Sequence, residues 1–489
     1  MLFNSHIFML LFLPLLLAGW YFLNWKKKFQ LAQGYLIGMS LWFYAYANLQ
    51  YLWLLLFSCL IGWLLSCLPE KIFSEKGKKV LTGVGCVFHL GLLGYFKYSN
   101  FFLENLNTVF HTDFPMLQIL LPVGISFYTF QQLAYLIDRC RGDAPRDSFF
   151  DYLTFMVYFP QLLQGPILLR SEFMGQLKEP EGRRFHAERF SEGIQFFVFG
   201  LAKKVLLADT LAKAVNYGYS NVSMLDSISA LLLAVGYLTE LYFDFSGYCD
   251  MAVGLGKMIG LEVAENFDAP FHSASVKEFW RRWHMTLGRF FTRYVYIPLG
   301  GNRRGKMRTL CNVMIVMLLS GLWHGAAWTF VLWGFLHGVG MIWDNLEHPH
   351  LPKKWMRQAA TFAYVCMTFV FFRAESIAQG IDVLKSIVSL KWNGFVFQMA
   401  SALDMTECYM ITKALSMKLP GLLSWFWLGI FVVLIAICFR VLSGEKVSGV
   451  VALQRQKGYG RLYPVLLAVL FTWSMISMTG VSEYLYFSF

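Results

Sequence analysis

Apolar stretches about as long as a membrane is thick recur along this 489-residue chain, and short basic clusters separate them. Inside lipid, a backbone must satisfy its hydrogen bonds within its own segment, which about 20 consecutive apolar residues do as a helix. The composition agrees: 57% of the residues are hydrophobic and 15% are charged, against about 45–50% and 25% in soluble domains. The chain is therefore predicted to be an all-α polytopic membrane protein.

We expect about ten to twelve membrane spans, together with re-entrant and interfacial helices. The predicted spans cover residues 1–23, 30–48, 51–68, 80–97, 117–137, 190–213, 226–246, 310–345, 357–373, 421–440 and 462–484. The stretch 310–345 is longer than one span requires, so we predict two segments bent near Gly325. Residues 149–169, interrupted by two prolines, are predicted to form a re-entrant hairpin, and 247–309 to form interfacial and re-entrant helices.

Basic clusters indicate the orientation of the spans. Lys26–Lys28 and Arg139–Arg146 are predicted to face the cytoplasm, which places Met1 outside. The net charge of +12 resides in such clusters, and little basic surface remains, so nucleic-acid binding is not expected. Lys203-Lys204 lies inside a predicted span, and we expect these side chains to snorkel toward the interface.

No internal repeat and no long linker divides the chain. We therefore predict a single integral-membrane domain over residues 1–489, with the core motifs at 90–345 and the C-terminal spans at 357–489.

Two histidines in apolar surroundings, His284 and His324, are the main candidates for chemistry. An ionisable side chain within a membrane is costly and is read as functional by default. A buried neutral imidazole suits removal of a proton from a hydroxyl, because desolvation lowers its pKa and keeps it in the base form. Gly321 and Gly325 flank His324 and would let another backbone or a ligand approach closely.

Other histidines have a simpler interpretation. His89 and His337 are read as core residues that satisfy themselves with one local hydrogen bond.

The residues before His284 predict a helix that begins with a capping box, formed by Ser275 and Glu278. On that helix Trp280, Trp283 and His284 are spaced i, i+3 and i+4. Two indoles and one imidazole are thus expected to share one helical face.

Asp244 and Asp250 place two carboxylates in an aromatic, glycine-containing run. They could bind an ion, orient an imidazole or pair with basic residues nearby. Structural pairing is the simplest alternative, because an unpaired charge there is costly.

Two other kinds of site are not expected. A metal site built from His284, His324 and His337 would lack both H-x-x-x-H spacing and an obvious carboxylate. The run Gly300–Lys306 matches G-x-x-x-x-G-K, but Met307 replaces the Ser or Thr that a P-loop needs, and no predicted strand precedes it. Nine scattered cysteines without a C-x-x-C pair indicate neither zinc nor a disulfide framework.

Several motifs occur together and in one order. They are Gly94–Tyr98, Leu121–Tyr128, Phe159–Gln161, Gly165–Ile167, Phe243–Tyr248, Glu265–Phe267, Trp280–His284, Tyr296–Arg303 and Gly321–Gly325. Taken together they resemble the membrane-bound O-acyltransferase superfamily, and in particular its alginate O-acetyltransferase branch, over roughly residues 1 to 345.

The resemblance implies a ring of tilted helices around a central funnel. It implies that His324 is the catalytic base and His284 the second polar residue of the active site. An acyl group would pass from a cytoplasmic thioester, either acetyl-CoA or an acylated carrier, to a hydroxyl presented from the opposite side, with no bound cofactor.

The same resemblance implies a place in the cell and a set of partners. The place is a bacterial inner membrane, and the product is an acetylated exopolysaccharide. The implied partners are membrane lipids, the polysaccharide acceptor and periplasmic or extracellular acetyltransferases, with an acyl carrier protein as a further candidate.

Further residues are assigned to two groups. The predicted substrate channel is lined by Trp280, Trp283, Trp323, Asp244, Tyr248 and Asn266. A basic surface that steers an anionic donor is predicted from Arg281, Arg282, Arg303 and Arg304.

Other functions stay open at this point. Within acyl transfer, the alternatives are D-alanyl transfer to teichoic acid and O-acetylation of peptidoglycan. From other classes, they are a transporter of polysaccharide or lipid that relays protons through Asp244, Asp250 and His324, and a scaffold that only assembles other enzymes.

Overall fold

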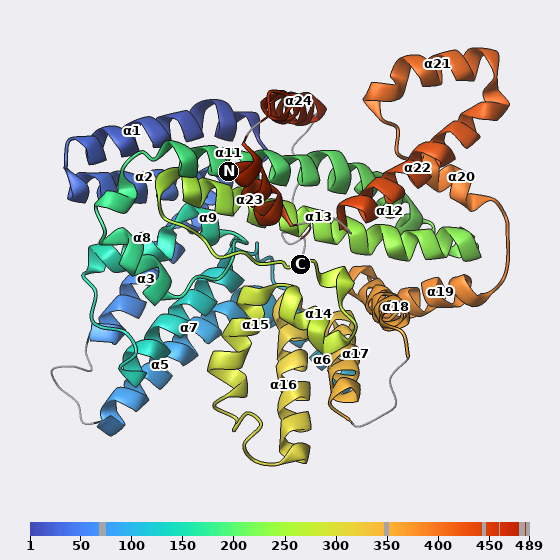
Figure 1. Cartoon of the computed structure of the whole chain (residues 1–489). Coiled ribbons are helices and arrows are strands. Elements are labelled where there is room, and N and C mark those ends of the chain that lie inside the picture. Colours follow the sequence, from blue (N-terminus) through green and yellow to red (C-terminus); the bar gives the residue numbers. More distant parts are fainter. Residues whose placement is uncertain (68–74, 347–351, 443–445, 459, 479–484, 486–489) are drawn as a thin grey trace. The chain divides into compact units, whose positions relative to one another are not determined.

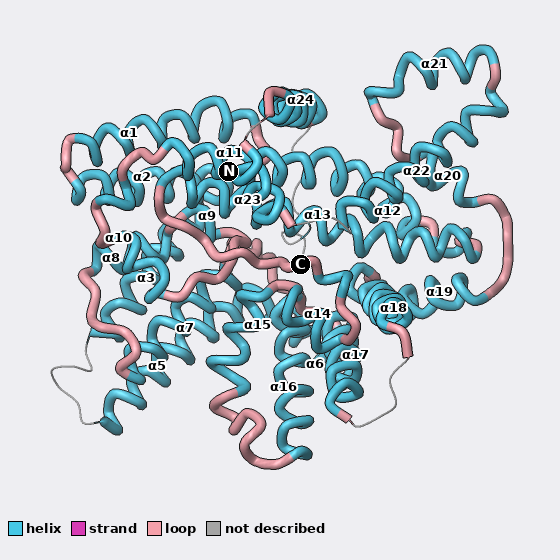
Figure 2. Tube along the Cα trace, viewed as in Figure 1, coloured by secondary structure: helices cyan, strands magenta, loops and turns pink. Residues whose placement is uncertain are grey.

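The computed structural model describes residues 1–67, 75–346, 352–442, 446–458, 460–478 and 485, and within these ranges every regular element is helical (Figure 2). The described chain groups into two compact units that alternate along the sequence. Unit 1 comprises Met1–Val198, Tyr248–Glu265 and Thr286–Pro298, and unit 2 comprises Phe199–Gly247, Asn266–Met285 and Leu299–Phe489. The expectation of one domain over residues 1–489 stays a prediction.

Unit 1 holds most of the N-terminal helices (Figure 1). Its elements are η1 (Phe8–Phe12), α1 (Leu13–Trp25), α2 (Phe29–Asn48), η2 (Leu49–Tyr51), α3 (Leu52–Cys67), α5 (Glu75–Leu93), η3 (Gly94–Tyr98), α6 (Ser99–Phe110), α7 (Ile125–Arg141), α8 (Phe149–Val157), α9 (Phe159–Leu162), α10 (Arg170–Leu177), η4 (Glu181–Arg183) and η8 (Thr292–Tyr296). Three helices contribute residues to both units: α11 (Ala187–Ala202), α13 (Ser227–Ile259) and α15 (Met285–Phe291).

Unit 2 holds the rest. Its elements are η5 (Lys203–Ala208), α12 (Asp209–Ser220), η6 (Val222–Met224), η7 (Pro270–His272), α14 (Val276–Arg282), α16 (Lys306–His324), α17 (Trp328–Asn345), α18 (Lys354–Arg373), α19 (Ile377–Val388), α20 (Phe395–Ser401), η9 (Thr406–Cys408), α21 (Tyr409–Lys418), α22 (Pro420–Leu442), α23 (Val447–Lys457) and α24 (Leu462–Ser477).

Six helical stretches among the described residues are long and apolar enough to cross a membrane. They are Phe8–Trp25, Leu49–Cys67, Lys76–Phe110, Ser227–Ile259, Lys306–His324 and Pro420–Leu442. Each covers part of a predicted span, and the prediction of an all-α polytopic membrane protein is confirmed. The total of about ten to twelve spans and their arrangement around a funnel stay predictions. The end of the last predicted span, residues 479–484, lies outside the described residues.

Two span boundaries were wrong. The span predicted at 117–137 is helical only from Ile125, because Pro122 has no N–H to donate and Gly124 takes a left-handed backbone with φ of 78°. The helix predicted to end at residue 246 instead runs through 33 residues to Ile259. The carboxylates of Asp244 and Asp250 therefore lie inside one continuous helix.

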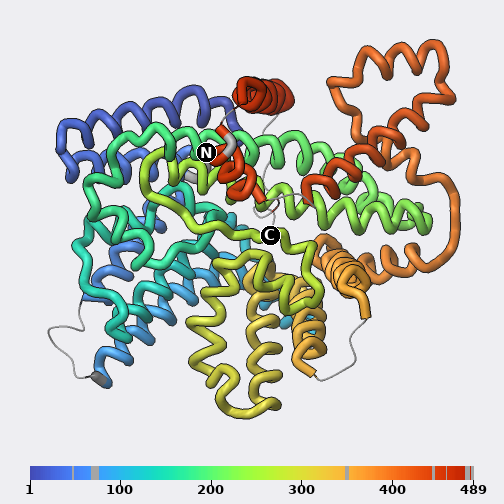
Figure 3. The backbone as a smooth tube through the Cα atoms, in the orientation of Figure 1, coloured from blue at the N-terminus to red at the C-terminus, as the bar shows by residue number. Residues whose placement is uncertain are grey.

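Two predicted interruptions are confirmed. The segment 149–169 breaks at Tyr158, which has an extended ψ of 107° between α8 and α9. The stretch 310–345 divides into α16 and α17, with Gly325 in an extended conformation at the turn. The yellow-to-orange part of the tube in Figure 3 shows these two helices running in opposite directions beside each other.

In unit 1, buried polar side chains form hydrogen bonds to other residues of the same unit. Trp20 in α1 donates to the carbonyl of Ile259 at 3.0 Å and so fastens the end of α13. His89 shares a hydrogen bond with Ser58 at 3.2 Å between their Nδ1 and Oγ atoms. The interpretation of His89 as a core residue with one local partner is confirmed.

Candidate active site

The candidate active site lies in unit 2, where glycines let α16 and α17 touch through their backbones. A Cβ atom at Gly321 would meet the carbonyl oxygen of Phe330, and one at Gly334 would meet that of Met317. Close backbone approach at small residues is the usual way that membrane helices pack. The predicted role of Gly321 is therefore confirmed, and the contact places the end of α16 against α17.

His324 is the last residue of α16 and is only 3% exposed. Three aromatic rings stand edge-on to it. The ring centroids of Trp323, Trp333 and Phe372 lie 4.9, 5.1 and 5.1 Å from that of the imidazole. The C-terminus of a helix favours positive charge, so this position would stabilise an imidazole that gains a proton.

His284 lies in the junction between α14 and α15 and is fully buried. Its backbone is left-handed, with φ of 46°, which is uncommon for a residue other than glycine and costs free energy. Asn266 holds this junction. Its carbonyl accepts from the N–H of Met285 at 3.0 Å, and its side-chain Oδ1 lies 3.2 Å from Nδ1 of His284.

The predicted cap by Ser275 is present, since its hydroxyl accepts from the N–H of Glu278. The reciprocal bond of a capping box is not formed, because Glu278 accepts from the N–H of Ala274 and not from that of Ser275. However, α14 ends at Arg282, and Trp283 is already extended. Trp283 and His284 therefore do not continue the helical face of Trp280, and that prediction was wrong. The cause is tertiary, because the carbonyl of Arg282 accepts from the N–H of Asp268 at 2.9 Å.

Trp323 brings the two predicted histidines together. Its ring centroid lies 6.1 Å from that of His284 and 4.9 Å from that of His324. Phe245 also contacts His284, with ring centroids 4.8 Å apart. Burial lowers the pKa of His284 to about 3, so its imidazole is neutral at physiological pH.

His337 in α17 has a different environment. Trp280 donates from Nε1 to Nδ1 of His337 at 3.2 Å, and Thr368 lies 3.0 Å from Nε2. The hydroxyl of Thr368 also donates to the carbonyl of Val365, so Nε2 of the histidine carries the proton and donates to Thr368. His337 is a core residue, as predicted, with two partners instead of one.

The other predicted channel residues are divided between the units. Trp283, Asn266 and Asp244 lie with the histidines in unit 2. Trp283 packs on Phe267 and Phe369, with centroids 5.1 and 5.6 Å away.

Tyr248 belongs to unit 1, where its ring stacks on that of Phe3 at a centroid distance of 4.7 Å.

The four predicted donor-binding arginines also differ from one another. Arg282 is held locally by Glu278 at 2.9 Å. Arg281, Arg303 and Arg304 are exposed, the last two on the turn before α16. Asn312 ties that turn to α16 by donating to the carbonyl of Gly301 at 2.9 Å. Within the part of the chain that the structure describes, no three His, Cys, Asp or Glu side chains gather to hold a metal ion.

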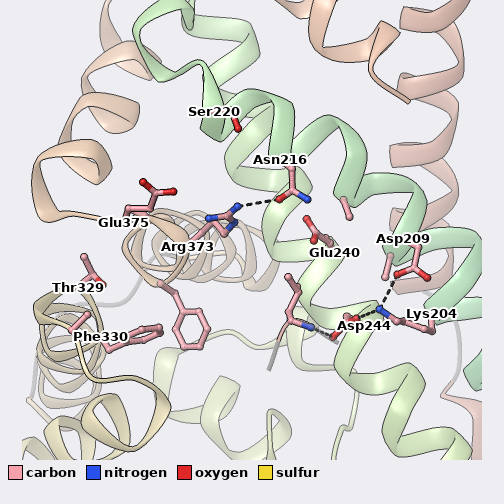
Figure 4. A pocket seen from close by; sticks show the side chains of 16 residues that line it. Lys204, Asp209, Asn216, Ser220, Glu240, Asp244, Thr329, Phe330, Arg373 and Glu375 are labelled. Carbon is pink, nitrogen blue, oxygen red and sulfur yellow. Dashed lines mark hydrogen bonds and ion pairs between the residues drawn. The ribbon is translucent and has the colours of Figure 1, made fainter. Parts of the chain in front are cut away.

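A cavity of about 760 Å³ lies beside the histidine site in unit 2 (Figure 4). Its lining includes Phe372, whose ring also contacts His324. The polar and charged residues that line it are Lys204, Asp209, Asn216, Ser220, Glu240, Asp244, Thr329, Arg373 and Glu375.

Lys204 corrects one expectation about this region. It does not snorkel; it is 1% exposed and lies 2.5 Å from Asp244 and 2.8 Å from Asp209. The wide π turn of η5 carries Lys204. Of the roles left open for Asp244, pairing with a basic residue is the one the structure supports, and that residue is Lys204.

The sequence reasoning missed Glu240, Arg373 and the aromatic residues Trp333 and Phe372. Glu240 carried a usable signal, since it is a carboxyl in the middle of the predicted span 226–246. The aromatic residues carried none, because rings are frequent throughout this chain.

Comparison with known proteins identifies relatives. Residues 139–379, which include both histidines, match the family model described as "MBOAT, membrane-bound O-acyltransferase family". The peptidoglycan O-acetyltransferase of Helicobacter pylori is 35% identical over 423 residues, which cover 80% of each chain. The "probable alginate O-acetylase" of Azotobacter vinelandii is 39% identical over 389 residues, 77% of this chain and 76% of that protein. A teichoic acid D-alanyltransferase of Streptococcus thermophilus is 28% identical over 253 residues, 49% of this chain and 58% of that protein.

Proposed function

The chain belongs to the membrane-bound O-acyltransferase family, and we propose that it passes an acetyl group from a cytoplasmic thioester across the membrane for O-acetylation of a cell-surface polysaccharide. One observation carries the proposal. His284 and His324, both buried, flank Trp323 beside a cavity large enough for a ligand. The chain is a multi-span O-acyltransferase of a bacterial family, and the proposal adds the donor, the direction and the residues.

His324 is the general base of the proposed reaction. It takes the proton of the accepting hydroxyl as the oxygen attacks the thioester carbonyl. The new C–O bond replaces the C–S bond, and the departing thiolate takes up the proton. The C-terminus of α16 favours the protonated imidazole that forms in between. Positioned acid–base catalysis of this kind contributes roughly 10²–10⁴-fold in rate.

His284 orients the accepting hydroxyl. An amide oxygen only accepts, so the contact between Asn266 Oδ1 and Nδ1 of His284 assigns the ring proton to Nδ1. The Nε2 atom of such a neutral ring is an acceptor. It is thus suited to receive a hydrogen bond from a hydroxyl and not to donate one to a carbonyl.

The donor, the partners and the placement complete the proposal. Acetyl-CoA or an acylated carrier protein is the donor, and the exposed Arg281, Arg303 and Arg304 attract its negative charge. The chain resides in the inner membrane with Met1 outside, and acetyltransferases beyond the membrane complete the transfer.

An alginate-like polymer is the first candidate acceptor and peptidoglycan the second. The second is supported by the relative from Helicobacter pylori, which aligns over 423 residues. D-alanyl transfer has weaker support, because the relative of that name aligns with only 49% of this chain.

The test uses the purified full chain in lipid vesicles with radiolabelled acetyl-CoA, and compares the wild type with His324→Ala. We expect thioester consumption by the wild type and a loss of at least a hundredfold in the variant. Full turnover by His324→Ala would refute the assignment of the base. If the wild type consumes no acetyl-CoA, the same assay with an acetylated carrier protein decides between a carrier donor and failure of the proposal.

A further inference from the structure

The turn that joins α1 to α2 carries three consecutive lysines, Lys26, Lys27 and Lys28 (Figure 1). It ends α1 with a Schellman motif, because the N–H of Lys27 donates to the carbonyl of Asn24 at 2.9 Å and that of Lys28 to the carbonyl of Leu23 at 3.0 Å. Lys27 has a left-handed backbone with φ of 57°, at the position of this motif where glycine is usual, because a Cβ atom there costs free energy. The local fold would favour glycine, so an exposed lysine in its place is a candidate for a binding role.

Aromatic side chains lie next to these lysines. Trp25, the last residue of α1, is 72% exposed, and Phe22 is 56% exposed. The Nζ atom of Lys26 lies 4.3 Å from the ring centre of Trp25, which is a cation–π contact. The stretch Phe8–Trp25 is long and apolar enough to cross a membrane, so the lysines directly follow the end of a candidate span. Tryptophan and lysine at the end of a span are typical of the level of the lipid headgroups.

The loop before α11 packs against this turn and extends its surface. The rings of Tyr21 and Phe185 have centroids 5.4 Å apart, and the guanidinium of Arg183 lies 5.9 Å from the ring centre of Phe29. The loop adds an exposed cation, Arg184, and an exposed ring, that of Phe185. Arg183 itself is buried, so it contributes positive potential beneath the surface without touching a ligand there.

Together these residues form a surface that we call the lysine surface. Its members are Phe22, Trp25, Lys26, Lys27, Lys28, Arg184 and Phe185. Among the described residues, no carboxylate forms an ion pair with any of the three lysines. Arg184 pairs with Glu181 at 2.9 Å, but both side chains are exposed, and such a pair is weak. The lysine surface is therefore strongly cationic, and an anionic ligand complements it.

The exposed rings decide which kind of anion fits. A soluble phosphate would use only the cations and would leave Phe22, Trp25 and Phe185 in water. A phospholipid presents a phosphate together with hydrocarbon chains, so it matches both the cations and the rings. An anionic headgroup gains most from the lysines, because it has no amine of its own to offset the phosphate.

We propose that the lysine surface is a binding site for an anionic phospholipid. Lys27 and Lys28 bind the phosphate of the headgroup, and the exposed rings contact the acyl chains. The site belongs wholly to unit 1. It involves none of the residues assigned to acetyl transfer, and so it goes beyond the proposed function.

The test measures lipid binding to the purified full chain in detergent by native mass spectrometry. The probes are phosphatidylglycerol, which is anionic, and phosphatidylcholine with the same acyl chains, which is zwitterionic. We expect the wild type to bind its first phosphatidylglycerol at least fivefold more tightly than its first phosphatidylcholine. Lys27→Gly should weaken the binding of phosphatidylglycerol about fivefold, which is the contribution of one lysine near anionic lipid, and should leave the binding of phosphatidylcholine nearly unchanged.

Lys27→Gly also separates binding from folding, because glycine adopts the left-handed backbone more readily than lysine. Its unfolding temperature in lipid-free detergent should equal or exceed that of the wild type, so weaker lipid binding would not reflect a damaged fold. The matched control is Lys413→Gln, which removes an exposed lysine that lies 5.6 Å from the ring centre of Tyr409 in α21. The control should bind both lipids like the wild type.

Equal affinities of the wild type for the two lipids would overturn the inference, as would unchanged binding of phosphatidylglycerol by Lys27→Gly. A third probe, glycerophosphoglycerol, carries the same headgroup without acyl chains and should bind at least tenfold more weakly. If it binds as tightly as the lipid, the surface is a site for soluble anions, and the lipid assignment is wrong. No acetyl donor is present, so the result does not depend on the acetyl-transfer test.

Discussion

His324 and His337 stand on the two arms of one helical hairpin, and both are buried. His337 is surrounded by groups that use both ring nitrogens, with Trp280 at 3.2 Å and Thr368 at 3.0 Å. His324 instead ends its helix among the rings of Trp323, Trp333 and Phe372. Burial alone does not separate the two. The difference lies in which groups surround the imidazole. One of the rings around His324, that of Phe372, also lines the cavity.

A comparison of substitutions at the two histidines is expected to give the largest effect. His324→Gln should lower the acetyl-transfer rate by roughly 10²–10⁴-fold and leave thermal unfolding nearly unchanged. His337→Leu should do the opposite, because it leaves the indole N–H of Trp280 without its acceptor, which costs about 1–3 kcal/mol. Turnover and unfolding temperature are measured on both variants. Similar losses of turnover in both would remove the distinction.

Gly321→Ala tests whether the hairpin positions His324. The new methyl group would meet the backbone carbonyl of Phe330, which cannot move aside as a side chain can. Overpacking of this kind costs typically about 1–3 kcal/mol, and activity should fall with stability. The control is Gly91→Ala in α5, where a Cβ atom meets nothing within 4 Å. That variant should be as stable as the wild type or slightly more stable.

Asn266→Ala tests the other histidine. Removal of Oδ1 takes away the group that holds the ring of His284, and a hydrogen bond is worth about 0.5–1.5 kcal/mol. We expect turnover to fall about threefold to tenfold. Asn266→Asp keeps an oxygen at this place and should retain more activity than the alanine variant. If the two substitutions have equal effects, Asn266 does not act through the ring of His284.

The pH dependence of stability tests the protonation state of the same histidine. The folded-state pKa of His284, lowered by burial to about 3, is below the ordinary value of about 6.5. Between these two values the unfolded chain binds a proton that the folded chain does not. The contribution of neutral His284 is therefore complete above pH 6.5 and declines as the pH falls below it, by at most about 1.4 kcal/mol per pH unit.

Thermal unfolding of the wild type and of His284→Gln between pH 4 and 8 checks this. The variant should lose less stability than the wild type on acidification. A pH dependence that is steeper in the variant would contradict the assigned neutral state.

Features that depend on a local sequence pattern could be predicted from the sequence. Hydropathy predicted the membrane helices, and Gly321 and Gly325 predicted the close approach at His324. The helix cap by Ser275 was also predicted correctly. Each of these depends on a few neighbouring residues, so no knowledge of distant partners was needed.

The rest depended on partners far away in the chain. The helix before His284 ends early because Arg282 bonds to Asp268, and helical spacing cannot reveal this. Lys204 is buried because Asp244, forty positions later, neutralises it. The aromatic rings around His324 come from three different helices. Spacing along one segment could not have assembled them.

The π turn of η5 also bears on how related sequences should be aligned. Such a turn holds one residue more than an α turn, and η5 lies directly before Asp209 and α12. Loss of one residue from Lys203–Ala208 would rotate everything that follows by about 100°. A single-position gap here in a relative would thus mark a protein whose α12 presents different side chains to the cavity, even where both histidines are aligned.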